Sequence, residues 1–340
     1  MVSIKDISAA CGVSVATVSK ALNDQKDVSE KTKTRIREIA KQMGYIPNSA
    51  SRSLRMKYTH NLGILYEEET GSGLTHDFFA GILESFKKTA ELHGYDITFV
   101  SNNVNSEKSM TYLERSLYRG FDGVMIACTD FDNDLIQELI ASEIPTVTID
   151  YKSEGTSSVM SDNDCGMREL VKYAYSLGHR KIAYIHGTDS YVTRARVQSF
   201  SVTCADLGFS LRDVYMSEIP YRDTTAAWIA TENMLRSGVK PTCIFYPDDL
   251  SIIGGMNCLL RYGLMIPDDI SVAGYDGSQL GHYFDPPLTT YEQDRTAIGN
   301  KAALQLIELI EHKDNTHEKT IIIPGKIYKG GTMDVAKTTV

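Results

Sequence analysis

Hydrophobic positions divide the chain into a short N-terminal part with helical spacing and a long remainder in which strand and helix patterns alternate. In the N-terminal part, Ile4, Ile7 and Ala10 recur every three residues, which places them on one face of a helix. Gly12 can take the left-handed conformation that ends a helix, and Ser14 can cap the next segment, VATVSKAL, with its hydroxyl. The pattern therefore predicts two short helices joined by a tight turn.

A third helix is predicted from about Ser29 to Met43. Ser29 is a capping residue, Ile36 and Ile39 share the inner face, and Gly44 ends the helix. Three helices in this order form a helix-turn-helix, which places the N-terminal turn of its second helix against the edges of DNA bases. The alternative for the same pattern is a plain three-helix bundle with a polar surface. We call residues 1–46 the headpiece.

The exposed face of the second helix carries side chains suited to the major groove. Val15 and Ala16 are small and apolar and can contact thymine methyl groups, while Lys20 can donate to guanine O6 or N7. Polar side chains nearby can bind phosphates, which fix the register on DNA without selecting a sequence. The expected phosphate contacts are Thr17, Ser19 and Asn23, and the expected DNA-contacting set of the headpiece also includes Ser29 and Tyr45.

From about residue 59 onward, short apolar runs alternate with amphipathic stretches. LGILY, DITFVS, GVMIA and TVTID predict strands, separated by helical stretches such as DFFAGILESFKKTAEL, and the alternation continues to ISVAGYD. Such alternation is typical of parallel sheets with right-handed crossovers. The strands are too many for one sheet of this size, so we expect two subdomains, with a ligand cleft at the carboxyl ends of their strands.

Charge is distributed unevenly along the 340 residues. The net charge is −9, but residues 1–58 hold eleven Lys and Arg against five Asp and Glu, a local balance of +6, and the remainder carries −15. This asymmetry indicates a basic nucleic-acid-binding module joined to an acidic body, because phosphate attraction acts over about one Debye length. A solvated charged face would give the same asymmetry, so charge alone does not decide between the two.

The sequence does not indicate a membrane-spanning or secreted protein. No apolar run approaches the roughly 18 residues that span a bilayer, and the start, MVSIKDISAACGVS, lacks a basic-then-apolar signal region. We therefore expect a cytoplasmic protein that does not contact a membrane. The six cysteines are scattered without a C-x-x-C pair, which favours buried reduced thiols over a zinc site or disulfides. They are Cys11, Cys128, Cys165, Cys204, Cys243 and Cys258.

Sequence motifs of catalysis are missing as well. The nucleophile-elbow, zinc-protease, P-loop and dinucleotide-binding patterns do not occur. Asp130, Asp132 and Asp134 have the spacing of a calcium loop, but the glycine of its sixth position and the glutamate of its twelfth are missing. We expect a solvated loop at this segment, no metal, no cofactor and no enzymatic activity.

Residues 4–55 resemble the headpiece of the LacI/GalR (lactose and galactose repressor) family of bacterial transcription regulators. The shared motifs are IKDIS, GVSVATVSKALN, VSEKT and GYIPNSASRSL. The resemblance implies that Val15, Ala16 and Lys20 contact base edges in the major groove of operator DNA.

Residues 47–58 form the predicted hinge between the headpiece and the large domain. Pro47 breaks the preceding helix, and the segment NSASRSLRM is too short to hold a helix alone, so a flexible linker is the plain interpretation. The family resemblance instead implies a hinge helix that pairs with that of a dimer partner in the minor groove. Leu54 would wedge between base pairs there, and Arg52 would lie near phosphates. A homodimer on a pseudo-palindromic operator is therefore expected.

The resemblance to the same family extends over almost the whole chain. Its clearest motifs in the large domain are LGHRKIA and GLMIPDDISVAGYD, followed by PPLTTYEQD. They imply an effector-binding and dimerisation domain at 59–340 with the type I periplasmic-binding-protein fold, an α/β/α sandwich in two subdomains. The subdomains are expected at about 60–161 plus 291–320 and at 162–290 plus 321–340.

The resemblance also implies effector-binding side chains, most of them at strand ends. Sugars are bound by planar polar side chains and by an aromatic ring on their C–H face. The candidates are Phe78, Asp150, Arg196, Tyr221, Asp248 and Asp276. Arg196 matches the arginine of an R-x-x-G-F motif although Ser199 replaces its glycine, and Asp248 stands where the family usually has Asn. Plainer alternatives remain, because Asp248 or Asp276 can cap the helix that follows, Tyr221 can pack in a core, and Arg194 and Arg196 can pair with surface acids.

The function predicted from these features is a transcription repressor whose operator affinity is controlled by a sugar or related small molecule. A sugar-binding protein of a transporter could use the same large domain, but the headpiece and the missing signal region disfavour it. An enzyme is the second alternative, and turnover of a sugar would support it.

Overall fold

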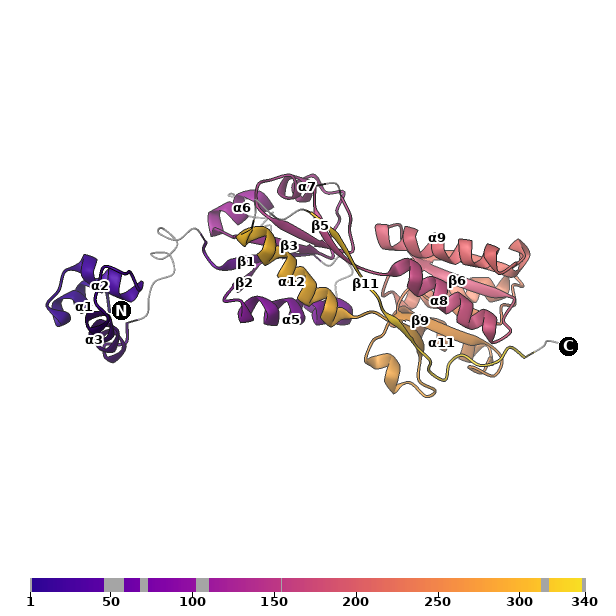
Figure 1. The fold of residues 1–340 in the computed structure, drawn as a ribbon. Helices are drawn as coiled ribbons and strands as arrows, with labels where there is room; N and C mark the ends of the chain where they lie inside the picture. Colours follow the sequence, from indigo (N-terminus) through magenta and orange to yellow (C-terminus); the bar gives the residue numbers. More distant parts are fainter. Residues whose placement is uncertain are drawn as a thin grey trace. The chain divides into compact units, whose positions relative to one another are not determined.

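The chain folds into two compact units, Met1–Thr59 and His60–Val340 (Figure 1). The computed structural model describes residues 2–45, 58–67, 73–101, 110–153, 155–312 and 318–337. Within these ranges, no helix is long and apolar enough to cross a membrane.

The first unit is a three-helix headpiece with α1 at Ile4–Cys11, α2 at Val15–Leu22 and α3 at Glu30–Gln42. A serine hydroxyl accepts a backbone N–H at the start of every helix, as its capping role requires: Ser3, Ser14 and Ser29. Gly12 ends α1 with a φ of 64°, in the left-handed region. The buried core between the helices consists of Ile7, Cys11, Val18, Ala21, Val28, Ile36 and Ala40. The predicted helix-turn-helix is therefore confirmed.

The second unit contains two six-stranded sheets, which form two lobes. All strands of the first sheet are parallel. In spatial order they are β11 (Thr320–Ile323), β5 (Ser157–Ser161), β4 (Thr146–Ile149), β3 (Gly123–Ala127), β1 (Asn61–Tyr66) and β2 (Asp96–Val100). The helices of this first lobe are α5 (Asp77–Leu92), α6 (Tyr112–Arg119), α7 (Asp134–Ile140) and α12 (Arg295–Glu311), with the short 3-10 helix η1 at Gly73–Thr75.

The second sheet is parallel except for its edge pair β10 and β12, which is antiparallel. In spatial order its strands are β12 (Lys326–Tyr328), β10 (Thr289–Glu292), β9 (Ser271–Asp276), β8 (Cys243–Phe245), β6 (Ile182–Gly187) and β7 (Val214–Ile219). The helices of this second lobe are α8 (Asn163–Ser176), α9 (Tyr191–Asp206), α10 (Thr224–Arg236) and α11 (Ser251–Arg261), with the 3-10 helices η2 (Leu211–Asp213) and η3 (Leu280–Tyr283).

Both sheets are covered on their two faces, which explains the nearly continuous apolar runs of their central strands. In β3, Val124 packs towards α6 and α7, while its neighbour Gly123 lies against α12. In β6, Tyr184 belongs to the core under α8 and α9, and Ile185 belongs to the core under α10 and α11. Helix α12 also packs closely on α5 (Figure 1), because a Cβ at Gly299 would lie 2.3 Å from the backbone oxygen of Ile82. The architecture is the α/β fold with two subdomains that the sequence predicts.

The chain passes between the lobes three times. The first passage follows β5, at the predicted boundary after residue 161. The second was expected after residue 290, but β10 pairs with β9 through Glu292, so the chain crosses after that residue. The third was expected after residue 320, but β11 pairs with β5 through Ile323 and the crossing follows it. Both shifts arise because the local pattern of a short strand does not reveal which sheet it joins.

Candidate DNA-contacting face and effector cleft

The expected base-contacting side chains of α2 lie on its exposed face. Val15 is 44% exposed although it is apolar, and Ala16 and Lys20 are exposed beside it. The apolar residues of the opposite face, such as Val18, are fully buried in the headpiece core. The helix therefore presents two small apolar side chains and one cation to a partner.

The Lys20 ammonium already has an acidic partner in the free headpiece. Its Nζ forms an ion pair with Asp27, and the two side chains are 45% and 52% exposed. The Lys20 hydrogen bond holds the pKa of Asp27 below its usual range. Any contact of the Lys20 ammonium with another group would therefore have to replace this solvated ion pair.

The expected phosphate-contacting residues have different exposures. Asn23 is exposed at the end of α2, and the half-buried Thr17 lies close to Ser14, with 2.8 Å between their hydroxyl oxygens. Ser19 is only 8% exposed and lies on the inner side of the helix. Ser29 is exposed and caps α3, whereas Tyr45 is half-buried against the headpiece core. The two hinge candidates, Arg52 and Leu54, lie outside the described residues.

A cavity of about 400 Å³ lies between the two lobes. The first lobe contributes Asp77 and Phe78 from the start of α5, and the second lobe contributes loops at its strand ends. The remaining lining residues are Arg222, Asp249, Leu250, Asp276, Ser278, Gln279, Leu280 and Tyr283. Two of the six expected effector residues, Phe78 and Asp276, therefore line this cavity.

Asp276 stands at the carboxyl end of β9 in a strained backbone conformation, with a φ of 106°. Its Oδ1 accepts a hydrogen bond of 2.7 Å from Nε2 of Gln293. Burial raises the pKa of the Asp276 carboxyl well above its usual range, and the nearby charge of Asp248 acts in the same direction, while Arg196 opposes it. An acceptor side chain is thus held at the cleft with little solvent around it.

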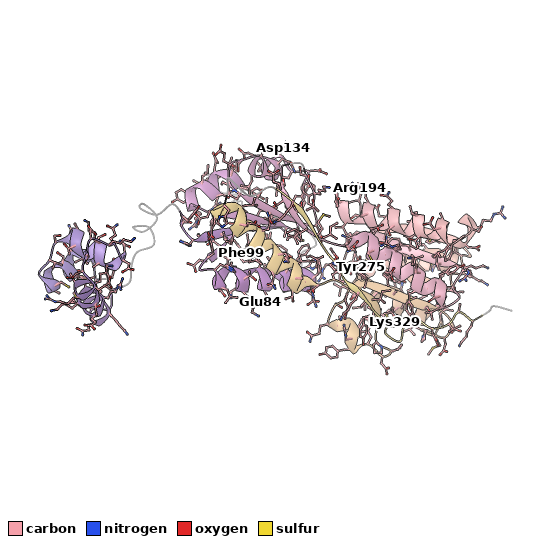
Figure 2. All side chains as sticks on the ribbon, in the orientation of Figure 1. Glu84, Phe99, Asp134, Arg194, Tyr275 and Lys329 are labelled. Carbon is pink, nitrogen blue, oxygen red and sulfur yellow. The ribbon has the colours of Figure 1, made fainter. Side chains whose placement is uncertain are left out.

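Arg196 is 3% exposed and lies behind this wall of the cleft. Its Nε donates to Oδ1 of Asn163 at 2.8 Å, its Nη1 donates to the backbone oxygen of Pro247 at 3.2 Å, and its guanidinium lies 3.6 Å from the ring centre of Tyr275. Arg194, by contrast, projects from the surface of α9 and pairs with Asp189, while Tyr275 lies inside the lobe (Figure 2). The surface-pairing alternative therefore fits Arg194 and not Arg196.

Asp248 binds backbone N–H groups at the start of α11, which agrees with the helix-capping alternative for this residue. Its Oδ1 accepts from the backbone N–H groups of Leu250 and Ser251, and its Oδ2 accepts from the Ser251 hydroxyl and from the backbone N–H of Arg222. The side chain is 2% exposed. Because all four acceptor positions of this carboxylate are occupied, it has little capacity left for a ligand.

Tyr221 and Asp150 lie near the cleft without lining the cavity. The hydroxyl oxygen of Tyr221 lies 2.9 Å from Oγ1 of Thr193, and its ring lies against Gly187, where an added Cβ would meet the ring at 2.0 Å. Asp150 ends β4 with a φ of 55° and accepts a 3.1 Å hydrogen bond from the backbone N–H of Ser161. Burial raises the pKa of Asp150 to about 6.

Sequence reasoning missed Asp249 and Arg222 as cavity residues. Asp249 is 1% exposed and accepts from Oγ1 of Thr290 at 2.7 Å and from the backbone N–H of Ser278 at 2.6 Å. Burial raises its pKa to about 7. The Asp248–Asp249 doublet was the available signal, but only its first member was selected, because the sequence does not tell which of two adjacent side chains faces a cleft.

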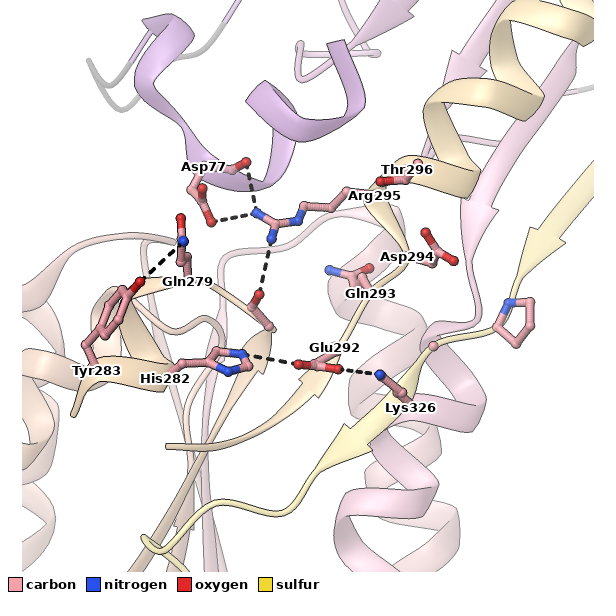
Figure 3. A pocket seen from close by; sticks show the side chains of 13 residues that line it. Asp77, Gln279, His282, Tyr283, Glu292, Gln293, Asp294, Arg295, Thr296 and Lys326 are labelled. Atoms are coloured by element: carbon pink, nitrogen blue, oxygen red, sulfur yellow. Dashed lines mark hydrogen bonds and ion pairs between the residues drawn. The ribbon is translucent and has the colours of Figure 1, made fainter. Parts of the chain in front are cut away.

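A second, wider cavity of about 750 Å³ adjoins the first at the crossing segments (Figure 3). There Nη1 of Arg295 donates to Oδ2 of Asp77 at 2.7 Å, and its Nη2 donates to the backbone oxygen of Gly277 at 3.4 Å. Glu292 pairs with His282 and Lys326, both at 3.2 Å. Since Gly277 follows Asp276 directly, the crossing segment contacts the cleft loop and α5 at once.

Metal and disulfide chemistry have no group of side chains to support them in the described ranges. These contain no cluster of three or more His, Cys, Asp or Glu that could hold a metal ion. None of the six cysteines forms a disulfide; Cys128 and Cys165 are half-buried and the other four are buried.

Comparison with known proteins matches both units to one family. Residues 3–48 match the family described as "Bacterial regulatory proteins, lacI family", and residues 59–331 match "Periplasmic binding proteins and sugar binding domain of LacI family". The HTH-type transcriptional repressor PurR of Vibrio cholerae serotype O1 (strain M66-2) is 30% identical over 327 residues, covering 94% of each chain. The repressor of the same name from Photobacterium profundum is 28% identical over 325 residues, covering 94% of this chain and 95% of its own.

Solved structures share the fold over nearly the whole chain. The lac repressor dimer bound to operator and the anti-inducer ONPF has a TM-score of 0.82 at 23% identity, covering 98% of this chain and 99% of that one. The complex of the transcriptional regulator CelR with cellobiose has a TM-score of 0.70 at 22% identity, covering 98% and 100%. At this level of identity the likeness concerns the fold alone.

A helix-turn-helix headpiece joined to a two-lobed effector domain defines a transcription regulator that responds to a small molecule. The chain belongs to the LacI family of bacterial regulatory proteins. It is a ligand-controlled DNA-binding repressor and, like its relatives, not an enzyme, as the sequence predicts.

Proposed function

We propose that this repressor binds a pseudo-palindromic operator as a homodimer and that a sugar or sugar derivative in the cleft between the lobes controls its operator affinity. The observation that carries the proposal is the 400 Å³ cavity lined from both lobes, by Phe78 on one side and Asp276 on the other. A ligand bound there contacts both lobes, so its affinity depends on how far they are closed.

On the DNA side, the exposed face of α2 supports major-groove contacts by Val15, Ala16 and Lys20. We propose phosphate contacts for the exposed or half-exposed polar residues of the set, Thr17, Asn23 and Ser29, and also for Tyr45. Ser19 would need to contribute through the edge of a nearly buried side chain. The proposed hinge roles of Arg52 and Leu54 rest on the sequence.

On the effector side, Asp276 is the proposed acceptor for sugar hydroxyls and Phe78 the proposed apolar surface for the C–H face. Arg196 and Tyr221 are proposed to hold this wall in place from behind, with Asp150 completing the first-lobe side. Asp248 is proposed as a supporting residue whose four hydrogen bonds fix the loops after β8 and β7.

The coupling route proposed here runs through the second crossing segment. Gln293 binds Asp276, and Arg295 bridges Gly277 and Asp77 (Figure 3). A ligand that moves the Asp276 loop therefore changes contacts with α12 and α5 of the first lobe. Such coupling is expected to amount to a free energy of about 1–3 kcal/mol.

A homodimer is proposed because one headpiece contacts too few bases, and two on a pseudo-palindrome multiply specificity. Large apolar side chains left exposed on the second unit support a further buried surface. They include Leu117 and Tyr118 of α6, which are 64% and 73% exposed. Operator binding also implies a location in the bacterial cytoplasm.

The test begins with the full-length protein and a library of random DNA, from which bound sequences are selected. A pseudo-palindromic consensus and a two-to-one stoichiometry in analytical ultracentrifugation are expected. Fluorescence anisotropy of the selected operator is then followed while a panel of sugars is added. A consensus without symmetry, or operator affinity that no sugar or sugar derivative alters, would contradict the proposal.

A further inference from the structure

We infer that Asp249 is a positioning residue, which holds residues 276–278 in the conformation that presents the Asp276 carboxyl to a ligand of the cleft. We call residues 276–278 the Asp276 turn. The inference rests on the proposed function of the cleft and adds a residue on which effector affinity depends. It starts from the hydrogen bonds of one buried carboxyl group, which binds this turn and the neighbouring strand β10.

The Asp276 turn has a backbone conformation that its surroundings must enforce. Asp276 has a φ of 106° and Gly277 a φ of 70°, and such values are costly for a residue other than glycine. The turn also lies close to the end of β10, because a Cβ at Gly277 would lie 2.7 Å from Cα of Glu292. If the contacts that hold the turn were removed, it would relax and the Asp276 carboxyl would leave its present position.

Asp249 binds the Asp276 turn directly and also through Thr290. Its Oδ2 accepts from the backbone N–H of Ser278 at 2.6 Å, and its Oδ1 accepts from the Thr290 hydroxyl at 2.7 Å. The Thr290 hydroxyl oxygen accepts from the backbone N–H of Gly277 at 3.3 Å. One carboxyl group therefore fixes two successive N–H groups of the turn, one of them through a hydroxyl.

The strands beside Asp249 hold its side chain in this place. Its backbone N–H donates to the backbone oxygen of Tyr275 at 3.0 Å. Its Oδ1 lies over Gly274 of β9, where an added Cβ would meet it at 2.2 Å, and Gly274 pairs with Thr290 of β10. The side chain thus crosses β9 at a residue that leaves room for it. Asp249 is 1% exposed and Thr290 is fully buried, so water does not compete for their hydrogen bonds.

These contacts indicate that Asp249 acts on a ligand through Asp276. Asp249 lines the cavity, but both of its oxygens already accept hydrogen bonds. Oδ2 of Asp276, by contrast, has no hydrogen-bond partner among the described residues and can accept from a ligand. Thr290 lines neither cavity, so a change at Thr290 can reach a ligand only through the Asp276 turn.

The second crossing segment holds the Asp276 turn as well. Nε2 of Gln293 donates to Oδ1 of Asp276 at 2.7 Å, and Nη2 of Arg295 donates to the backbone oxygen of Gly277 at 3.4 Å (Figure 3). The turn is therefore bound by Asp249 and Thr290 of the second lobe and by the segment proposed to transmit the effector response. Loss of the Asp249 contacts should weaken both effector binding and that response.

The test compares wild type with D249A, T290V and the conservative variant D249N. Two controls lie in the same lobe. D206N changes an exposed acid at the end of α9, and T231V removes a buried hydroxyl of α10 that donates to the backbone oxygen of Ala227. T231V matches T290V in chemistry and burial, so it separates a general loss of stability from a loss at the turn. Circular dichroism and melting temperature of all variants are compared first.

Hydrogen exchange of the full-length protein without ligand, followed by mass spectrometry, reports on the Asp276 turn itself. In D249A and T290V, protected positions of a peptide covering residues 274–281 should exchange roughly tenfold faster, because a hydrogen bond to the turn is lost. The same peptide should be unchanged in D206N and T231V. D249N should stay close to wild type, since its amide can accept from Ser278 and donate to Thr290.

Effector affinity is the second measurement. The probes are D-glucose, D-galactose, D-ribose, N-acetyl-D-glucosamine, D-glucosamine and D-glucuronate, screened by thermal shift at millimolar concentration. Calorimetry then measures the affinity of the best binder. D249A and T290V should bind it roughly tenfold to a hundredfold more weakly than wild type, and D249N within about threefold of it. D206N and T231V should bind it as tightly as wild type does.

T290V decides the inference, also if D249A does not fold. Exchange of the 274–281 peptide that T290V leaves unchanged overturns it. So does an effector affinity that T290V leaves unchanged, because a loss confined to D249A would mean that Asp249 contacts the effector itself.

Operator titration separates this inference from the proposed function. If a probe binds and changes operator affinity while T290V behaves as wild type, the proposed function stands and the positioning role falls. If a probe binds with the expected dependence on Asp249 and Thr290 but does not change operator affinity, the proposed control of DNA binding falls instead. If no probe binds wild type, the proposed function falls, and the exchange of the Asp276 turn decides the positioning role.

Discussion

The buried carboxyl of Asp249 makes the stability of the second lobe depend on pH, and the substitution Asp249→Asn should remove part of that dependence. The pKa of this residue is raised from 3.8 to about 7, chiefly by burial. A raised pKa in the folded state means that folding favours the neutral acid. The stabilisation is complete below the pKa of the unfolded chain and is lost as the pH rises through about 7.

The size of the effect follows from the shift of the pKa. A change from 3.8 to about 7 corresponds to about 4 kcal/mol of unfolding free energy, lost between pH 4 and pH 8. Because Asp249 is 1% exposed, solvent screening reduces this little. Asparagine has nearly the same shape, can accept from Ser278 and donate to Thr290, and does not ionise in this range.

Urea unfolding of full-length protein from pH 5 to pH 8, followed by tryptophan fluorescence, measures the effect. Trp228 is the single tryptophan and lies on α10, in the same lobe as Asp249. Relative to wild type, D249N should gain stability as the pH rises, whereas D132N, at an exposed acid, should follow wild type. If the unfolding free energies of D249N and wild type changed in parallel from pH 5 to pH 8, the reasoning would be refuted, whatever the constant difference between the two proteins.

Three further predictions follow from the two units. Leu54→Ala should weaken specific operator binding strongly in a gel-shift assay, because a leucine wedge between base pairs stabilises the bent complex. Effector binding measured by calorimetry should stay unchanged. Equal operator affinity of variant and wild type would contradict the wedge role. Asp27→Asn should raise operator affinity a few-fold in anisotropy, because Lys20 no longer has to leave an ion pair, and an unchanged or lower affinity would contradict this. Gly299→Val should lower the unfolding free energy of the second unit, measured in urea, by about 3 kcal/mol or more, because a Cβ would lie 2.3 Å from the backbone of α5. The control Lys301→Val, on the exposed side of α12, should lower it by less than about 1 kcal/mol.

The long amphipathic helices could be predicted from the sequence almost to the residue. The stretch DFFAGILESFKKTAEL coincides with α5 at Asp77–Leu92, because sixteen residues give several turns of periodic pattern. Strand β5, SSVMS, was missed although all five of its residues are buried. Its serines are accommodated by hydrogen bonds, as when Ser158 donates to the backbone oxygen of Tyr151 at 2.7 Å, and a search for apolar runs does not detect such a strand.

Only some of the cavity residues could be predicted from the sequence, and the reason the others were missed is physical. Asp276 ends a strand in a specific family motif, and it lines the cavity. Asp248 and Asp249 are adjacent, yet the turn after β8 directs Asp248 to the start of α11 and leaves Asp249 at the cavity. The position of Arg222 depends on a left-handed backbone conformation, which cannot be predicted from the sequence when the residue is not glycine.

The most direct test of the central claim is a thermodynamic cycle for effector and operator. Using the sugar or sugar derivative that raises the melting temperature most, operator affinity is measured with and without effector, and effector affinity with and without operator. In wild type the two ratios should be equal and differ from one by about 5- to 150-fold, and in D276N both should approach one while operator affinity without effector stays unchanged. An operator affinity that saturating effector does not alter in wild type, or a response that persists in D276N, would contradict control of DNA binding through this cleft.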